Sequence, residues 1–253
     1  MNISFYTAAV GAGQQQERLN VHANNIANVN TFGFRAKKPA FQPLKTGPVR
    51  GIEEDVTRGV GARMEAADTD FGSSGFTGTG LYTDYAIDGH GFFALLDPTS
   101  GEYSYTRDGS FIKSEYYVRQ EDDEMPEVAP GNVRYPGYER RWYLSDGNGR
   151  FVLGTNGRPI EMDDSKNALD VGIFDFINYN GMQSLSENRV IPVEKNGQVG
   201  LGSGTLVQGY LELSNTDLAN EFAKVIESQR SFQYMLRMVT TSDEIETTVN
   251  NLR

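Results

Sequence analysis

The stretch that decides the fold is residues 214–253, SNTDLANEFAKVIESQRSFQYMLRMVTTSDEIETTVNNLR. It contains neither glycine nor proline, and Ser214 followed three residues later by Asp217 resembles a capping box. These features predict one long helix over about residues 217–250. About 34 helical residues would span roughly 50 Å, which is more than a chain of this size needs to cover its own core. We therefore expect this helix to pack against a further partner.

Apolar side chains repeat along this predicted helix at steps of four and three residues, the spacing of a heptad seam. After a shift of one residue, which locally overwinds a coiled coil, the seam continues to the end of the stretch. The predicted interface residues are Leu218, Phe222, Val225, Gln229, Phe232, Leu236, Val239, Ile245, Val249 and Leu252.

The N-terminal segment carries a second, weaker seam. Ser4 is a candidate N-cap, and Asn28, Asn30 and Gly33 should end the helix near residue 28. A seam so rich in alanine buries too little to hold an isolated helix, so partners in the last helix or in other copies are expected. The alternative is two amphipathic helices that cover a sheet within one globule. The N-terminal interface residues would be Phe5, Ala9, Ala12, Gln16, Leu19, Ala23 and Ile26.

Charge is distributed unevenly along the 253 residues. The formal net charge is −11, with +4 over residues 1–45, −12 over the middle and −3 over residues 210–253. An acidic chain is a poor ligand for a phosphate backbone, so nucleic acid is not an expected partner.

No apolar run approaches the roughly 18 residues of a membrane-spanning helix. The absence of cysteine excludes disulfides and thiolate chemistry. The start of the chain resembles no cleavable secretory signal, so export is expected to use another route.

The middle of the chain has the pattern of an antiparallel β domain. Two stretches predict hairpins, one over residues 103–111 with a turn at Asp108-Gly109, and one over residues 142–153 with a turn at residues 146–149. Further strands are expected around residues 171–177 and 206–213.

Four segments follow from these patterns, and together they predict an α+β fold in which heptad helices at both ends flank the β region. Residues 1–41 hold the first helix and its turn, and residues 42–61 form a Gly/Pro-rich linker. Residues 62–213 form the β region, with an acidic loop of little strand character over about 115–141, and residues 214–253 form the last helix.

Chemical motifs are weak. The two histidines, His22 and His90, lie far apart in the sequence and predict no metal site. The run Asp146–Arg150 begins like a calcium loop, but an arginine stands where an oxygen ligand is needed. The alternating glycines of residues 200–204 lack the pattern of a dinucleotide site. The acid pairs at residues 122–123 and 163–164 are typical of solvated surface, although glycosidase chemistry also needs two acids. We predict no enzyme activity, no catalytic residue, no cofactor and no metal.

Several longer motifs identify a resemblance. Residues 23–35, ANNIANVNTFGFR, are similar to the N-terminal signature of the bacterial flagellar rod, hook and hook-associated axial proteins. The signature turn includes Asn24, Asn25, Asn28, Gly33 and Phe34. Other family-like motifs follow in order at residues 86–93 (AIDGHGFF), 105–111 (YTRDGSF), 186–188 (SEN) and 208–215 (QGYLELSN), and the last leads into residues 229–232 (QRSF). The resemblance therefore covers nearly the whole chain.

The resemblance implies a structural subunit of the flagellar rod in the basal body, of distal or proximal type. Such a subunit would pass through the flagellar type III export apparatus without a cleaved signal. Its terminal helices would form the inner tube, in contact with copies of itself, with other rod and hook proteins and with surrounding ring or cell-wall components. The alternatives are a low-copy adaptor that joins rod segments or joins rod to hook and, more remotely, an extracellular β-rich enzyme.

Overall fold

The computed structural model describes residues 3–44, 47–48, 57–58, 61–119, 125–162 and 169–252. They form two compact units, each built from separate parts of the chain. The helical unit comprises residues 1–29, 36–70 and 216–253, and the β-rich unit comprises residues 30–35 and 71–215. Two helices combined with antiparallel sheets agree with the predicted α+β class. This division differs from the predicted segments at three places, because residues 62–70 group with the helices, and residues 30–35 and 214–215 group with the strands.

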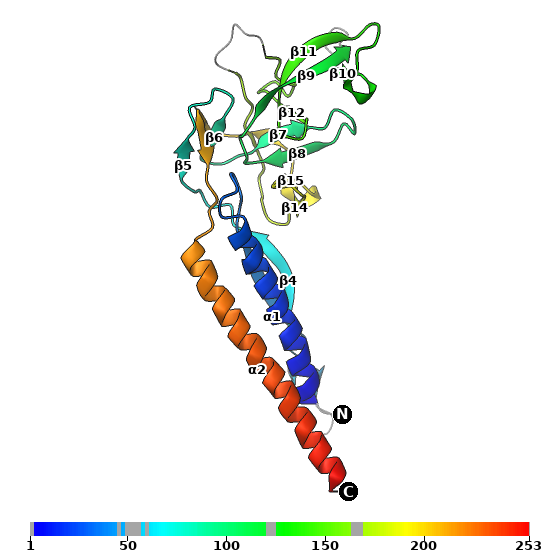
Figure 1. Cartoon of the computed structure of the whole chain (residues 1–253), viewed down its shortest axis with the longest axis vertical. Helices are drawn as coiled ribbons and strands as arrows, with labels where there is room; N and C mark the ends of the chain where they lie inside the picture. The colour runs from blue at the N-terminus through cyan, green and yellow to red at the C-terminus, as the bar shows by residue number, and fades with distance from the viewer. Residues whose placement is uncertain are drawn as a thin grey trace. The chain divides into compact units, whose positions relative to one another are not determined.

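The helical unit contains α1 (Ile3–Ala27), α2 (Leu218–Asn251) and a pair of strands. Figure 1 shows α1 (blue) and α2 (orange to red) side by side, with β4 along α1. β1 (Lys37–Pro43) pairs antiparallel with β4 (Ala62–Thr69), and the amide N–H of Met64 donates to Oε1 of Gln14 on α1. This unit also includes the short pair β2 (Gly47–Pro48) and β3 (Thr57–Arg58). Residues 45–46, 49–56 and 59–60 of the predicted linker lie outside the described residues.

The C-terminal end of α1 and both ends of α2 agree with the sequence, but the caps do not. Ser4, the candidate N-cap of the first helix, lies inside α1, which begins at Ile3. The Asp217 carboxylate accepts hydrogen bonds from the amides of Ala219 and Asn220, at 3.1 and 3.3 Å, so Asp217 is the N-cap. The prediction that Ser214 caps the helix was therefore wrong. An acid at this position also complements the positive end of the helix dipole.

The β-rich unit is built around one large sheet. Among the described residues this sheet has the strand order β10-β9-β11-β12-β7-β8-β15-β14, with every pair antiparallel. Smaller two-stranded sheets pair β6 with β17, β5 with β18 and β13 with β16. The short 3-10 helices η1 (Pro130–Asn132) and η2 (Glu194–Asn196) lie between strands. The strands are β5 (Phe76–Gly78), β6 (Tyr85–Asp88), β7 (Phe93–Leu96), β8 (Tyr103–Thr106), β9 (Ile112–Arg119), β10 (Glu127–Val128), β11 (Glu139–Ser145), β12 (Phe151–Val152), β13 (Phe174–Asp175), β14 (Gln183–Ser184), β15 (Arg189–Ile191), β16 (Gly200–Leu201), β17 (Thr205–Gln208) and β18 (Tyr210–Glu212).

One predicted hairpin is confirmed and the other is wrong. β11 and β12 pair through Ser145 and Phe151, around a turn in which Asp146 accepts hydrogen bonds from the amides of Asn148 and Arg150. By contrast, β8 pairs with β7 and β15, whereas β9 pairs with β10 and β11. The Asp108-Gly109 turn therefore sends the chain to another part of the sheet instead of folding it back.

Three further expectations were right only in part. Within residues 115–141, β9 extends to Arg119 and β11 begins at Glu139, so both ends of the predicted acidic loop are strands, while residues 120–124 lie outside the described residues. The stretch 171–177 contains only the two-residue strand β13. The strand predicted over 206–213 is divided into β17 and β18 at Gly209, whose φ of 78° breaks it.

The core of the β-rich unit consists of large side chains in two clusters. One contains Tyr85, Phe93 and Phe111, in which the last two rings meet edge to face at 5.1 Å. The other contains Tyr116, Tyr143 and Phe151. These rings bury large apolar areas and favour tilted or edge-on pairs. None of the described helices is long and apolar enough to cross a membrane.

Candidate functional site: motif clusters and assembly surfaces

A buried cluster of three charges lies within the β-rich unit. Glu212 accepts hydrogen bonds from Nη2 of Arg35 at 2.6 Å and from Nη1 of Arg107 at 3.2 Å. All three side chains are buried. Burial lowers the pKa of Arg107, and the nearby Glu212 opposes that effect. A carboxylate held between two guanidinium groups has its charge compensated where water cannot reach it.

Backbone carbonyl groups complete this cluster. Arg107 donates to the carbonyl oxygens of Ile87 and Gly89, at 3.1 and 2.6 Å, and Arg35 donates to that of Gly72 at 2.6 Å. Hence the motif segments 30–35, 86–93, 105–111 and 208–215 all meet at Glu212 and its two arginine partners.

The fifth motif segment, residues 186–188, joins the same network. Nδ2 of Asn188 donates to the carbonyl oxygen of Phe32 at 3.1 Å, and Oγ1 of Thr106 donates to the carbonyl oxygen of Asn188 at 3.1 Å. The sequence motifs that carry the family resemblance are therefore, in this unit, the residues that fasten distant segments of the chain together.

Gly33 of the signature turn has a steric reason to be glycine. Its φ is +65°, and a Cβ atom at this position would lie 2.4 Å from the carbonyl carbon of Arg107. The Gly33 amide donates to the carbonyl oxygen of Glu212 at 2.7 Å, and the neighbouring Phe34 is buried. Any side chain would push this turn away from the arginine–glutamate cluster.

The helical unit has its own buried polar cluster. Nδ1 of His22 lies 2.7 Å from Oε2 of Glu221, and Nδ2 of Asn25 donates to the same oxygen at 3.1 Å. Lys224 donates to Oε1 of Glu221 at 3.1 Å. Burial raises the pKa of Glu221, but the bonds from His22, Asn25 and Lys224 outweigh it and lower that pKa.

Asn25 also binds both backbone groups of Lys37, on β1. Its Oδ1 accepts from the Lys37 amide and its Nδ2 donates to the Lys37 carbonyl oxygen, both at 2.9 Å. Nearby, Asn28 caps the end of α1 by donating to the carbonyl oxygen of Asn24 at 2.9 Å. Asn25 therefore joins α1, β1 and α2, whereas Asn24 and Asn28 are local to the helix end.

Only part of the predicted seam of α1 is buried within the chain. Ala12 is buried, whereas Ala9, Gln16 and Ala23 are exposed, and Phe5, Leu19 and Ile26 are partly buried. The fully buried residues of α1 are Ala8, Ala12, His22 and Asn25. Within one chain, the covered face of α1 is therefore rotated by about one residue from the predicted seam.

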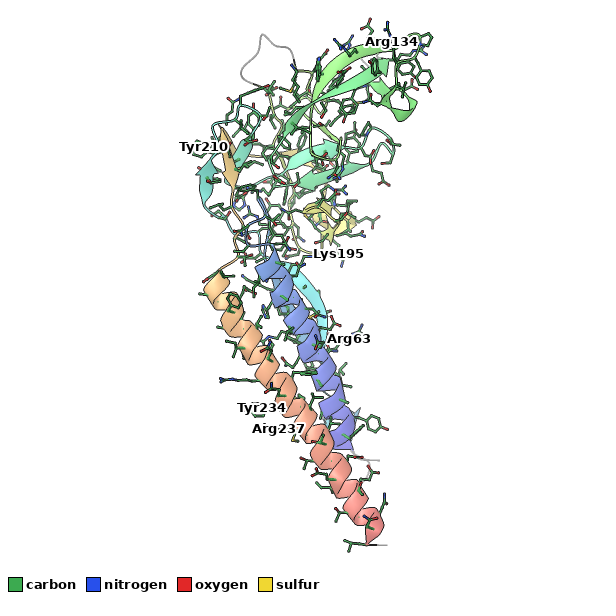
Figure 2. The ribbon with its side chains drawn as sticks, in the orientation of Figure 1. Arg63, Arg134, Lys195, Tyr210, Tyr234 and Arg237 are labelled. Carbon is green, nitrogen blue, oxygen red and sulfur yellow. The ribbon has the colours of Figure 1, made fainter. Side chains whose placement is uncertain are left out.

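The predicted seam of α2 is divided in the same way. The buried residues are Glu221, Ser228 and Ser242. Three predicted seam residues, Val225, Phe232 and Val239, are partly buried beside them, and the rest are exposed. The exposed members are Leu218, Phe222, Gln229, Leu236, Ile245, Val249 and Leu252. Tyr234, labelled in Figure 2, adds an exposed ring.

An apolar groove of about 580 Å³ lies within the helical unit. Two methionines, Met235 and Met238, line it from α2, and methionine adapts its shape readily to a partner. The other lining residues are Thr7, Ala8, Gly11, Gln14, Gln15, Phe41, Gly61 and Ala62.

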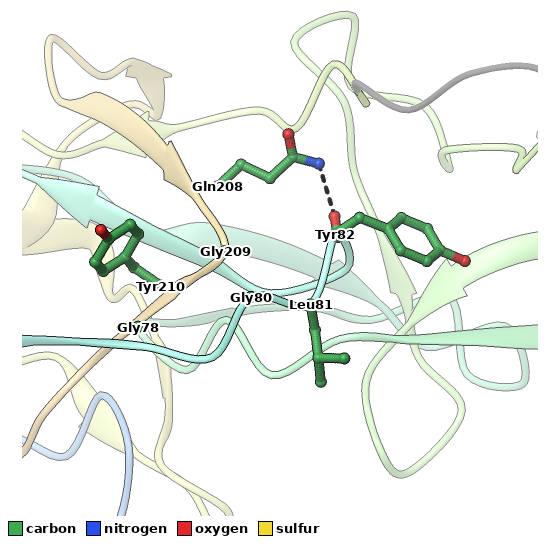
Figure 3. Close-up of a pocket in the computed structure, with 7 residues that line it drawn as sticks. All are labelled: Gly78, Gly80, Leu81, Tyr82, Gln208, Gly209 and Tyr210. Carbon is green, nitrogen blue, oxygen red and sulfur yellow. Dashed lines mark hydrogen bonds between the residues drawn. The ribbon is translucent and has the colours of Figure 1, made fainter.

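A second groove, of about 410 Å³, lies in the β-rich unit and carries no ionisable pair suited to catalysis (Figure 3). Its lining consists of Gly78, Gly80, Leu81, Tyr82, Gln208, Gly209 and Tyr210. Gln208 donates to the carbonyl oxygen of Tyr82 at 2.8 Å and is thereby held in place. Exposed aromatic rings beside glycine backbone suit a contact with another macromolecule.

Among the described residues, no group of three His, Asp or Glu side chains is arranged to hold a metal ion. His22 is engaged by Glu221, and His90 lies against Tyr179 with ring centroids 6.2 Å apart. Burial raises the pKa of Tyr143 to about 12, as expected for a core phenol. The acid pairs at 122–123 and 163–164 lie outside the described residues.

Sequence reasoning found the motifs but missed how they meet. Arg107 and Glu212 lie inside quoted motifs, yet nothing in their spacing shows that they pair with each other and with Arg35. Glu221 was missed altogether, although a charged residue next to the seam residue Phe222 was a usable signal.

Two family models match the ends of the chain. The model described as "Flagella basal body rod protein" matches residues 5–35, and the model described as "Flagellar basal body rod FlgEFG protein C-terminal" matches residues 207–252. These ranges include nearly all of α1 with the signature turn, and the whole of α2.

Comparison with whole proteins gives nearly full coverage. The chain is 30% identical over 271 residues to flagellar basal-body rod protein FlgG of Bacillus subtilis, covering 99% of this chain and 98% of that protein. It has the same identity and coverage with FlgG of Borreliella burgdorferi. A part of the chain, 43%, is 32% identical to 26% of the flagellar hook protein FlgE of Helicobacter mustelae. These relatives are named as rod and hook proteins and not as enzymes.

Proposed function

The chain belongs to the FlgG family of flagellar basal-body rod proteins, and we propose that it polymerises through its terminal helices into the hollow axial tube of the rod. The tube would transmit torque and let exported subunits pass through its centre. Membership of the family implies a structural role in the basal body and assembly with other rod and hook proteins.

The observation that best supports polymerisation is that α2 buries polar residues within the chain and exposes large apolar ones. Its residues buried within the chain are Glu221, Ser228 and Ser242, whereas Phe222, Ile226 and Ile245 are at least half exposed. A helix that exposes its large apolar side chains lacks its main partner, because burial of apolar area is what stabilises helix packing. Neighbouring copies would supply that partner.

Contact between two unlike surfaces would favour an open polymer. The apolar groove is lined mainly by residues outside α2, together with Met235 and Met238, whereas Phe222, Ile226 and Ile245 are exposed on α2 and do not line the groove. Contact between unlike surfaces repeats without closing when the rotation does not close a ring. The predicted interface residues, from Phe5 through Ile26 on α1 and from Leu218 through Leu252 on α2, would then be shared between contacts within the chain and contacts between copies.

The β-rich unit would lie outside the tube and supply lateral contacts. Its glycine- and tyrosine-lined groove is one such surface (Figure 3). The negative charge of the middle of the chain would reduce adhesion to ring or cell-wall components. Passage through the flagellar export apparatus without a cleaved signal, in an unfolded state, belongs to the same proposal.

The test is complementation of a strain that lacks the gene for this chain. The variant would combine Phe222→Ser, Ile245→Ser and Leu252→Ser, which removes three exposed apolar side chains of α2. We expect normal amounts of the protein, no swimming, and basal bodies without complete rods in electron micrographs. The matched control is Gln233→Ser, which changes an exposed polar residue of the same helix. Complete rods in the triple variant would contradict assembly through this face.

Copy number separates the polymer from the alternative adaptor. Both would use the same fold, but a polymer is present in many copies per basal body and an adaptor in few. Quantitative mass spectrometry of isolated basal bodies, with a hook protein as internal standard, measures this ratio. A chain that forms only stoichiometric complexes with other rod proteins would be the adaptor. The enzyme alternative would require turnover that vanishes when one carboxylate is changed.

A further inference from the structure

The β-rich unit carries exposed aliphatic side chains beside the two-stranded sheet of β13 and β16. Ile177 is 89% exposed, Leu201 is 69% exposed and Val199 is 42% exposed. A Cβ atom at Gly197 would lie 3.4 Å from Cδ1 of Ile177, so the Ile177 side chain lies over the segment that leads into β16. Exposed apolar side chains gathered in one place are typical of interaction surfaces. We call Ile177, Val199 and Leu201 the aliphatic patch.

The groove of about 410 Å³ in the same unit is fixed by its own hydrogen bonds. The Gly80 amide donates to the carbonyl oxygen of Gly209 at 3.1 Å, and Gln208 donates to that of Tyr82 at 2.8 Å. Figure 3 shows the rings of Tyr82 and Tyr210 on opposite sides of this glycine backbone, and both rings are about half exposed. The groove, which we call the tyrosine groove, therefore offers two aromatic walls to an aliphatic side chain from outside.

Both surfaces lie in the uncharged parts of an acidic unit. Residues 71–215 contain 21 Asp and Glu against 11 Lys and Arg, a formal net charge of −10. The longest runs in this range without any of these four residue types are 71–83, 176–186 and 196–211. These runs contain the whole aliphatic patch and the whole lining of the tyrosine groove. Because two copies of an acidic unit repel each other where their charges meet, contact between copies is favoured at these uncharged surfaces.

The aliphatic patch and the tyrosine groove are separate surfaces. They share no residue, and they lie beyond opposite ends of β17, since Leu201 precedes its first residue, Thr205, and the groove begins at its last, Gln208. The ends of a four-residue strand are about 10 Å apart. One copy can therefore present its patch to one neighbour and its groove to another, an arrangement that repeats as an open polymer.

We infer that the aliphatic patch of one copy inserts into the tyrosine groove of another copy of this chain. Ile177 and Leu201 then lie against Tyr82 and Tyr210, and the apolar area of both surfaces is removed from water. A protruding surface fills a hollow one, whereas two patches or two grooves would meet without filling each other. This inference rests on the proposed polymer and names the residues through which its β-rich units touch.

Cysteine cross-linking tests the contact, because the chain has no cysteine of its own. A strain that lacks the gene would produce the chain with Leu201→Cys and Leu81→Cys, one in each surface. Isolated basal bodies would be treated with a short bismaleimide, which joins nearby thiols without the strict geometry of a disulfide. We expect a ladder of linked dimers, trimers and larger products on a denaturing gel, because every contact holds one thiol from each copy.

The controls contain the same thiols in other combinations. Each single variant places only one thiol in every contact and should stay monomeric on the gel. Leu201→Cys with Val133→Cys, whose second position is 56% exposed and outside both surfaces, should also give no ladder.

Each other outcome overturns the inference in a distinct way. Rods with many copies of the chain but no ladder would overturn the contact and leave the polymer standing. Linked dimers of the single Leu201→Cys variant would mean that two patches meet. Products linked only to a different protein would assign the patch to that protein. Few copies of the unmodified chain per basal body would count against the polymer itself.

Ile177→Glu provides an independent test that needs no cross-link. It changes a side chain that is 89% exposed, so the free energy of unfolding of the monomer should hardly change. Incorporation into basal bodies should fall at least about tenfold, because the contact would bury a carboxylate without a partner. Val133→Glu adds the same charge outside both surfaces and should incorporate normally. Equal incorporation of the two variants would overturn the inference even if the cysteine variant did not assemble.

Discussion

The two units of this chain bury opposite kinds of side chains. The β-rich unit encloses Phe93, Leu144 and Phe151, whereas the helical unit encloses Ala8, Ser228 and Glu221 and leaves Phe222 and Ile226 exposed. Burial of apolar side chains is the main favourable term in folding. The β-rich unit buries large apolar side chains within one chain, whereas the helical unit buries few of them. The difference supports the proposal that one unit is a self-contained body and that the other is completed by contacts between copies.

The largest effect is expected from the aromatic core of the β-rich unit. Phe93→Ala removes a fully buried ring that packs on Phe111 and should lower the free energy of unfolding of this unit by about 3–5 kcal/mol. Urea unfolding followed by the fluorescence of Trp142, the single tryptophan, reports on this unit. Leu201→Ala, at a 69% exposed position, should change stability by no more than about 0.5 kcal/mol. Equal effects of the two changes would mean that the core is not where the structure places it.

Next in size is the arginine–glutamate cluster. Glu212→Gln keeps the shape of the side chain but leaves Arg35 and Arg107 without their common counter-charge, and should cost about 3 kcal/mol in the same urea experiment. Glu139→Gln removes a largely exposed carboxylate that pairs with Arg141 in the same unit, and should cost about 0–1 kcal/mol. If Glu212→Gln were as mild as Glu139→Gln, the five motif segments would not be held together by this charge.

Hydrogen exchange compares the units directly. In the verified monomer, amides of α1 and α2 should open with a free energy on the order of 2 kcal/mol below that of amides in β7 and β11, because the helices lack their apolar partners. On assembly the helical amides should become protected while the β-sheet amides change little. Equal protection of helices and sheet in the monomer would indicate a self-contained helical core and would favour the adaptor.

A smaller effect is expected at the start of α2. Asp217→Ala removes the carboxylate that accepts from the amides of Ala219 and Asn220, and should lower the stability of the helical unit by about 1 kcal/mol. Circular dichroism at 222 nm measures the thermal unfolding of the helices, and tryptophan fluorescence measures that of the β-rich unit. A lower melting temperature in the first signal alone would locate the loss of stability in the helical unit. Ser214→Ala is the informative comparison, since the sequence pointed to Ser214 as a cap and the structure assigns that role to Asp217.

The sequence predicted the local features of this fold better than its long-range pairings. Both helices end where turn residues and the lack of glycine and proline indicated, and the Asp146 turn closes its hairpin as expected. The Asp108-Gly109 turn misled because a dipeptide specifies a bend but not which strand follows it. The sequence could not predict the pairing of Arg35, Arg107 and Glu212 either, because this pairing joins residues up to 177 positions apart.

The helical seams show a different limit of sequence reasoning. Heptad spacing located α1 and α2, but on α2 it selected mostly large apolar residues, whereas the residues buried within one chain are Glu221, Ser228 and Ser242. On α1 the buried face is displaced by about one residue from the predicted, alanine-rich seam. Hydrophobic periodicity reports every surface that a helix will bury, including surfaces buried against other copies. A seam that is rotated from the in-chain contact is what an assembling subunit would show.

The smallest effect on the monomer is therefore the most informative about function. Phe222→Ser changes a half-exposed ring on α2, and the free energy of unfolding of the isolated chain should change by no more than about 0.5 kcal/mol. The same change should weaken incorporation into rods, because there the ring would be buried against a neighbour. Stability by thermal unfolding and incorporation into isolated basal bodies must be measured on the same variant, with Gln233→Ser as a polar control on the same helix. A loss of monomer stability equal to that of Phe93→Ala would show that Phe222 belongs to the core of the single chain, and the contrast between the two units would then disappear.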